Sequence, residues 1–357
     1  MRNALLKIGL MAGSLSLVFM IFEIGLRFAG WSPIYEVYSK PSIMWQHDDL
    51  LGWSHVPGSR DIYIGPRPWP IEFETSIEIN SLGLRGPEVK PLPPSGVRIL
   101  VAGDSRAVAL EVPYKQTFGA LLEKNLKSEL NVPVQVINVG VRGYGTDQSY
   151  LHFRDRGRKL APDLVIFLHS QNDVRNNVTL HRMRRPFGKS VFVLDEAGEP
   201  ELTGFPVPSF PLCSSISLTT SYQVFRRDSL TQRIFCNLQL VLFDRSATFT
   251  MVTMRIQQNP QLIARLYRVG APDETASARN TDIETLPWDR RLTEALLTRF
   301  ARTVRKSGSD MVLLGRNNTL GDIAAEAVSI EGARLIPLDD AFNGLDPAEV
   351  RFVNDGH

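Results

Sequence analysis

Short apolar runs alternate with segments of helical spacing through the chain after residue 96. Residues 99–103 are all apolar or tiny, show no helical spacing and follow a proline-rich stretch. A run of this kind is typical of a strand buried on both faces in a parallel sheet. Comparable apolar runs occupy residues 134–139, 163–168, 310–314 and 333–336. The sequence therefore predicts strands at each of these places.

Apolar residues at helical spacing lie between these runs. They predict helices over residues 118–130, 150–160 and 292–304, with a further helix ending near residue 328. Strands and helices that alternate in this way form a parallel sheet with helices on its faces. We therefore expect an α/β domain over residues 96–357.

Residues 176–280 interrupt this alternation. Two short segments, residues 191–194 and 200–203, flank a turn and predict a hairpin, and residues 222–254 have a mixed, helix-like apolar pattern. A long excursion between sheet elements is typical of an insertion, which we expect to shape a substrate cleft.

The first 30 residues have the pattern of a membrane segment. Residues 8–22 carry no charge. The apolar stretch 5–26 reaches the length of about 20 residues that a span needs, if Lys7 and Glu23 extend to the interfaces. A cleaved signal peptide is the alternative, although no small-residue cleavage site follows directly. Positive charge before the segment predicts that the N-terminus lies in the cytoplasm. The rest of the chain is then expected in the periplasm or outside the cell.

Residues 31–95, here called the collar, are rich in Trp, Pro, Gly and Tyr. Alternating apolar and polar residues over 71–79 predict a strand with one wet face, followed by turn residues at 80–83. Residues 91–96 have the composition of a stiff linker. The collar is therefore expected to be a small β-rich pre-domain between the anchor, residues 1–30, and the α/β domain.

Composition narrows the functional classes. The formal net charge is +2 and no basic stripe with interleaved aromatic residues is present, so nucleic-acid binding is not predicted. The two cysteines, Cys213 and Cys236, do not have metal-ligand spacing, and whether they form a disulfide stays open.

Polar residues follow three of the predicted strands. Ser105 comes after Gly-Asp at the end of 99–103, Gly140 opens a glycine-rich loop, and Asn172 lies just past 163–168. The carboxyl ends of parallel strands, about 4.8 Å apart, meet at one edge, where ligands bind. Ser105 could attack a carbonyl there, with its own N–H, the Gly140 N–H and the Asn172 amide as oxyanion donors. Taken alone, Gly-Asp-Ser would more often cap a helix.

A serine nucleophile needs a base, usually a histidine that a carboxylate orients. Of the six histidines, His357 follows the last predicted strand and stands two positions after Asp355, where it could reach Ser105 across the pocket. His169 directly follows the third strand and would line or flank the cleft. His152 is expected to be a surface or packing residue.

Together these segments resemble the four blocks of the SGNH (GDSL) hydrolases. The blocks are Gly-Asp-Ser at 103–105, Asn-Val-Gly at 138–140, Gln-Asn-Asp at 171–173 and Asp-Gly-His at 355–357. The resemblance covers residues 97–357 and implies a flavodoxin-like three-layer α/β/α domain that uses no metal and no organic cofactor.

By position, the resemblance implies Ser105 as nucleophile, His357 as general base and Asp355 as its orienting acid. It implies Gly140 and Asn172 as oxyanion donors beside the Ser105 N–H. The front of the chain also resembles a membrane-anchored bacterial subgroup. The resemblance there is carried by a Glu-x-x-x-Arg at 23–27 and by Asn-Ser-Leu-Gly-Leu-Arg-Gly at 80–86.

Several positions depart from the family pattern. Arg106 stands where a small or apolar residue is usual, and it could hold an anionic substrate or form a salt bridge. Gln171 replaces a glycine, and with Arg106 and His169 it is a candidate substrate contact. Asp355 stands two residues, not three, before His357. Family members usually continue past this histidine, so a shortened product, an incomplete gene model and an inactive protein stay open.

Two function classes follow from these features. The first is a membrane-tethered esterase outside the cytoplasm that hydrolyses or transfers an acyl or acetyl group. Its substrate would be an acylated small molecule or polysaccharide, such as an envelope glycan, and a lipid ester stays open. The second is a catalytically degenerate member that binds a glycan or scaffolds an envelope complex. The oligomeric state stays open.

Overall fold

The protein is described by a computed structural model. It covers residues 2–31, 33, 46–65, 71–178, 188–207, 245–249, 251–252, 288–316, 328–329 and 331–345. Cys213, Cys236, Asp355 and His357 lie outside these described residues, as do most of the expected helical stretch 222–254 and most of the helix expected to end near residue 328.

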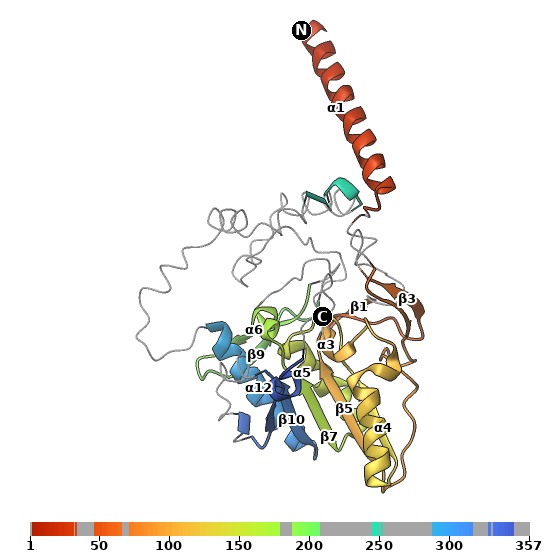
Figure 1. Ribbon diagram of the computed structural model, residues 1–357. Helices are drawn as coiled ribbons and strands as arrows, with labels where there is room; N and C mark the ends of the chain where they lie inside the picture. The colour runs from red at the N-terminus through yellow and green to blue at the C-terminus, as the bar shows by residue number, and fades with distance from the viewer. Residues whose placement is uncertain are drawn as a thin grey trace.

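A five-stranded parallel sheet forms the centre of the molecule (Figure 1). Its strands are β5 (Val97–Gly103), β6 (Val134–Asn138), β7 (Leu164–Leu168), β10 (Asp310–Gly315) and β11 (Arg334–Pro337). Their order in the sheet is β11-β10-β7-β5-β6, so the first strand of the domain lies between the second and the third. This is the flavodoxin-like order, in which ligands bind at the carboxyl ends of the strands beside the point where the order reverses, here between β5 and β7.

Alternate residues of the strands cover the two faces of the sheet. Ile99 and Val101 pack with Leu122 and Leu126 of α4 (Phe118–Leu130) on one face. Leu100 and Ala102 belong to the core of the opposite face, which also holds apolar residues of α5 (Thr146–Asp155) and α12 (Trp288–Lys306). The domain is therefore a three-layer α/β/α structure, as the sequence predicts.

One helix begins earlier than expected. The segment expected at 150–160 is α5, which starts at Thr146, followed by a 3₁₀ turn, η2 (Gly157–Leu160). The whole stretch 146–153 is buried, its polar residues included. A helix that is buried all round shows no wet face, so its first turn could not be found from amphipathic spacing.

The collar consists of two small antiparallel pairs. Strand β1 (Gln46–Asp48) pairs with β2 (Gly52–Ser54), and β3 (Arg60–Ile64) pairs with β4 (Glu74–Glu78), the strand expected at 71–79. Trp53, Tyr63 and Ile77 are buried in the same apolar cluster as residues of the sheet, α5 and α12. The collar and the α/β domain thus share one hydrophobic core.

The insertion contains the expected hairpin, β8 (Val191–Leu194) paired with β9 (Pro200–Thr203). The described residues also contain four further short elements. These are α3 (Ser105–Val108), η1 (Tyr114–Gln116), α6 (Gln171–Asn177) and η4 (Asp339–Phe342).

Helix α1 (Arg2–Phe28) projects away from the body of the molecule (Figure 1). Its segment Gly9–Phe28 is 20 residues long, has a mean hydropathy of 1.8 and is not buried, so it is long and apolar enough to cross a membrane. Signal sequences meet the same criterion. Near its end, the Glu23 carboxylate accepts hydrogen bonds from the backbone of Ala247 and Thr248, which ties α1 to a helical segment of the insertion.

Candidate active site

Asp104 connects two of the strand ends at the point where the sheet order reverses. One of its carboxylate oxygens accepts a hydrogen bond from the Arg106 N–H at 2.9 Å and so caps the N-terminus of α3. The other accepts a hydrogen bond from the Asn172 side-chain amide at 3.0 Å. Asp104 is only 2% exposed, which keeps both hydrogen bonds away from water. This carboxylate therefore fixes Asn172 relative to the helix that carries Ser105.

The turn from β5 into α3 requires a glycine. Gly103 has a φ of 145°, and a side chain there would meet the Leu168 carbonyl oxygen at 3.0 Å. Gly103 is also in register with Leu168 of β7. Ser105 follows two residues later as the first residue of α3, so it stands directly above the junction of β5 and β7.

Asn138 connects the end of β6 to α3. Its side-chain amide donates to the Ala107 carbonyl at 2.6 Å, and its side-chain oxygen accepts from the Gly140 N–H at 2.9 Å. Gly140 also lies very close to α3, because a Cβ at this position would be 2.8 Å from the Val108 nitrogen. The predicted oxyanion donor Gly140 is thus beside α3, the helix that begins at Ser105, with its N–H directed at Asn138 in this conformation.

Asn172 lies in the first turn of α6, just past β7. An amide nitrogen carries two hydrogens. The hydrogen bond to Asp104 uses one of them, which fixes the amide plane. The second hydrogen is the one that the sequence-based expectation assigns to the oxyanion. Among the described residues, Ser105, Gly140 and Asn172 therefore come from three neighbouring strand ends, as expected.

His169 lies under this edge and not at its surface. Its ring is fully buried, and Nδ1 is 3.1 Å from an Asp173 carboxylate oxygen. The same oxygen accepts the Ser170 N–H at 3.1 Å. Burial raises the pKa of Asp173 to about 6, an effect that the neighbouring His169 opposes. A buried ring makes no substrate contact in this conformation, so the structure favours a supporting role for His169 over the expected place in the cleft.

The two other candidate substrate contacts are exposed. Arg106 follows Ser105 in α3, and Gln171 begins α6 on the opposite side of the β5–β7 junction. Both residues lie in the first turn of their helix, just past the carboxyl ends of β5 and β7. The base and its acid, His357 and Asp355, lie outside the described residues, so their roles remain expectations from the sequence.

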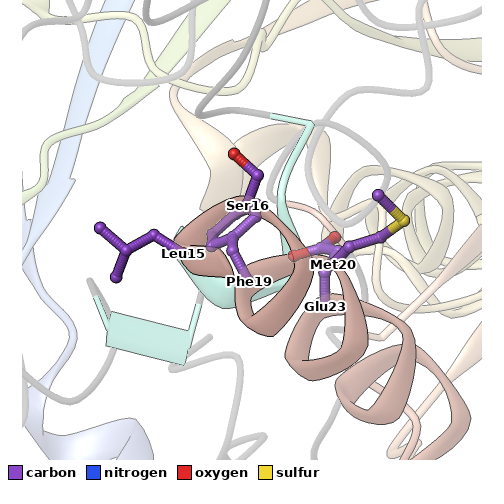
Figure 2. A pocket seen from close by; sticks show the side chains of 5 residues that line it. All are labelled: Leu15, Ser16, Phe19, Met20 and Glu23. Carbon is purple, nitrogen blue, oxygen red and sulfur yellow. The ribbon is translucent and has the colours of Figure 1, made fainter. Parts of the chain in front are cut away.

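A shallow groove elsewhere in the described part of the chain lies far from this chemistry. Leu15, Ser16, Phe19, Met20 and Glu23 line it along one side of α1 (Figure 2). It belongs to the projecting apolar helix, whereas Ser105 and Asn172 belong to the sheet domain (Figure 1). In the part of the chain that the structure describes, the sheet edge is where the expected nucleophile Ser105 and the expected donors Gly140 and Asn172 come together.

No protein-family model matches this chain. No curated protein matches it either. Among solved structures, it is similar to AlinE4, an SGNH-hydrolase family esterase, with 12% identity, 73% of this chain and 86% of that chain covered, and a TM-score of 0.34. It is similar to TesA with 14% identity, coverage of 71% and 86%, and a TM-score of 0.34. A variant of Axe2, an acetyl-xylooligosaccharide esterase from Geobacillus, has 10% identity, coverage of 74% and 88%, and a TM-score of 0.35. At these identities and TM-scores the likeness carries no argument, and the assignment of the fold rests on the sheet order of the described strands.

Sequence reasoning did not identify the roles of Asp104 and Asp173. Both occur inside the quoted blocks, at 103–105 and 171–173, but block spacing gives no information on which oxygen meets which amide. The sequence predicts Asp104 only as a helix cap, whereas in the structure it also accepts the hydrogen bond of the Asn172 amide. A useful signal would have been that an amide donor facing an oxyanion needs a fixed acceptor behind it.

Proposed function

We propose that this chain is a membrane-anchored serine esterase of the SGNH type, with its catalytic domain outside the cytoplasm. The observation that carries the proposal is the convergence of Ser105, Gly140 and Asn172 at the β5–β7 edge, held by Asp104 and Asn138. That arrangement supplies a nucleophile and donors for a developing oxyanion, which acyl transfer requires.

In the proposed reaction, Ser105 Oγ attacks the ester carbonyl carbon while His357 takes the hydroxyl proton and Asp355 orients the imidazole. The carbonyl oxygen becomes an oxyanion that accepts hydrogen bonds from the Ser105 N–H and the Asn172 amide. The Gly140 N–H joins by sharing its hydrogen between the oxyanion and Asn138. The C–O bond of the ester then breaks, and the imidazolium returns its proton to the leaving alcohol.

Water completes the cycle in a hydrolase. It attacks the acyl-serine carbonyl, gives a proton to His357 and releases the acid and the free Ser105 hydroxyl. A sugar hydroxyl in place of water gives an O-acyltransferase with otherwise identical chemistry. A tether beside an envelope glycan favours acetylated or acylated sugars as substrates. The exposed Arg106 beside the nucleophile favours substrates that carry negative charge near the ester.

Turnover of p-nitrophenyl acetate by the purified chain tests the catalytic proposal, with the Ser105→Ala variant as the matched control. We expect hydrolysis by the native chain and a rate at background for the variant. Equal rates for both proteins would instead support the glycan-binding or scaffolding alternative.

Membrane fractionation tests the anchor: a membrane-bound chain that retains its N-terminal residues supports it, and a soluble chain cleaved near residue 30 contradicts it.

A further inference from the structure

Arg85 is a buried arginine of the collar that reaches the nucleophile helix. It is only 2% exposed. Its guanidinium donates to the Val108 carbonyl at 2.6 Å, to the Ala109 carbonyl, and to the Val112 carbonyl at 2.5 Å. These carbonyls belong to the end of α3 and the loop that follows it. The contact thus joins the collar to the segment that carries Ser105.

Helix α3 cannot hold its own shape without help. It has only four residues, and the last four carbonyls of any helix lack N–H donors within it. A single isolated turn is unstable because its nucleation cost is not repaid. The residue that caps the C-terminus of the helix, Ala109, has a left-handed φ of 48°, a conformation that is unfavourable for a non-glycine residue. The planar guanidinium fork satisfies the Val108 carbonyl at the end of α3 together with the Ala109 and Val112 carbonyls that follow it.

The backbone of Arg85 contacts the second block of the site. Arg85 forms an antiparallel bridge with Asn138, the residue whose side chain holds Ala107 of α3 and the Gly140 N–H. It forms another bridge with Ile79, which fixes it to the end of the collar strand. One residue therefore touches both the nucleophile helix and the residue that aligns the Gly140 loop.

We infer that Arg85 is a positioning residue for the reaction at Ser105: it holds α3 and the Gly140 loop in the geometry that catalysis needs. The inference rests on the proposed esterase function. It assigns a role to the collar, because the catalytic edge is complete only when residues 79–86 are docked on it. Arg85 does not touch substrate; it acts through the carbonyls of α3.

Arg98 offers a matched control. It lies near the start of β5, the strand whose other end leads into α3. Its guanidinium also donates to two backbone carbonyls, Leu160 at 2.5 Å and Lys90 at 2.9 Å. Arg98→Ala therefore removes a similar set of hydrogen bonds at the edge of the sheet away from Ser105. A general loss of stability affects both variants, whereas a loss of positioning affects only Arg85→Ala.

Kinetics with p-nitrophenyl acetate and hydrogen exchange of the 104–112 peptide test the inference. For Arg85→Ala we expect kcat to fall about 10- to 100-fold with KM within about twofold, since small misplacements of reacting groups have effects of this size. Exchange of the 104–112 amides should accelerate, and millimolar guanidinium should restore part of kcat. Arg98→Ala should leave kcat within about twofold and exchange of 104–112 unchanged at a similar loss of melting temperature.

Equal effects of the two variants on kcat and on exchange would overturn the inference. If Arg85→Ala does not fold, Arg85→Lys replaces it. Since an ammonium cannot reproduce the planar fork, it should keep the fold, lower kcat and speed exchange of 104–112. Hydrogen exchange is measured without substrate and does not depend on catalysis. If the native chain showed no esterase activity, the proposed function would fail, and the exchange data would still show whether Arg85 stabilises α3.

Discussion

At the scale of single residues, the candidate site depends on side chains that hold other groups in place. Asp104 uses one oxygen to cap α3 and the other to hold Asn172. Asn138 uses its amide to hold Ala107 and its oxygen to hold the Gly140 N–H. The two proposed oxyanion donors, the Asn172 amide and the Gly140 N–H, are thus held in place by other side chains, and fixed donors lower the cost of stabilising an oxyanion.

The close approach of Gly140 to α3 makes a specific prediction. In Gly140→Ala, the added methyl would lie 2.7 Å from Ala107 Cβ and 2.8 Å from the Val108 nitrogen, so α3 has to move. We expect a loss of about 1–3 kcal/mol in the free energy of unfolding and a large fall in esterase kcat. Urea titration and p-nitrophenyl acetate kinetics measure both.

Gly65→Ala is the control for that change. A Cβ at Gly65 meets its nearest atom at 3.4 Å, an ordinary contact in the collar. Its kcat should stay near that of the native chain. If Gly140→Ala kept full activity and stability, the packing of the Gly140 loop against α3 would be contradicted.

His152 predicts a dependence of stability on pH. Burial, helped by the nearby Arg156 and His55, lowers the pKa of His152 to about 4, while Asp48 and Asp155 oppose the shift. The folded state therefore resists protonation of a histidine that titrates near 6.5 when unfolded. Between pH 6.5 and 4 the unfolded chain takes up a proton on His152 that the folded chain does not. The free energy of unfolding is therefore highest above pH 6.5 and decreases as the pH falls toward 4.

Through His152, we expect the free energy of unfolding to be about 2 kcal/mol lower at pH 5 than at pH 7.5. Urea titrations of the native chain and of His152→Gln at both pH values measure it. The variant has no titrating ring at this position, so its stability should fall less between pH 7.5 and 5. Parallel falls in the two proteins would show that other groups cause the pH dependence.

At the scale of elements, the secondary structure was predictable where a strand is a short apolar run or where a helix has one apolar and one polar face. The five strands of the central sheet were found from apolar runs, and α4 and α12 from helical spacing. The first turn of α5 was missed because its polar residues are buried with the apolar ones. Strand β3 was missed because its exposure pattern does not alternate clearly: Arg60 and Ile62 are exposed and only Tyr63 is buried.

A buried ion pair joins α5 to the insertion. Lys189, just before β8, contacts the carboxylate of Asp147 in the first turn of α5, and both side chains are almost completely buried. Burial raises the pKa of Asp147, which the Lys189 charge opposes. Lys189→Met should destabilise the fold by about 3–5 kcal/mol, because it leaves a buried carboxylate without its partner.

The double variant Lys189→Met with Asp147→Leu separates the effect of an unpaired buried charge from the effect of lost packing. Replacing both charges by apolar groups of similar size should recover most of the lost stability. Urea titration of the two variants gives the comparison. A double variant as unstable as the single one would show that packing, and not the unpaired charge, causes the loss.

At the scale of the whole molecule, the collar is part of the folded body. Trp53, Tyr63 and Ile77 lie in the core that the sheet, α5 and α12 also form, and Arg85 reaches α3. A chain beginning at residue 31 should therefore fold, whereas one beginning at residue 96 should lack a cooperative unfolding transition. Circular dichroism during thermal unfolding of both chains checks this. A cooperative transition of the shorter chain would make the α/β domain independent of its collar.

The sequence predicted the four blocks and the sheet edge where three of them meet, because motif order and strand ends are local features. It did not predict that the His169 ring is buried against Asp173, because the direction of a side chain after a strand depends on its neighbours in space. It did not reveal the role of Arg85 for the same reason. Segment 80–86 was noticed as a pattern, but its target carbonyls lie more than 20 residues away in the chain.

The most direct test of the account is the site at which a serine-directed fluorophosphonate reacts. Peptide mapping by mass spectrometry locates the adduct on the purified chain, with Ser105→Ala treated in parallel. The account predicts one adduct, on Ser105, and none on the variant. An unlabelled native chain, or equal labelling of both proteins at another residue, would contradict Ser105 as the nucleophile.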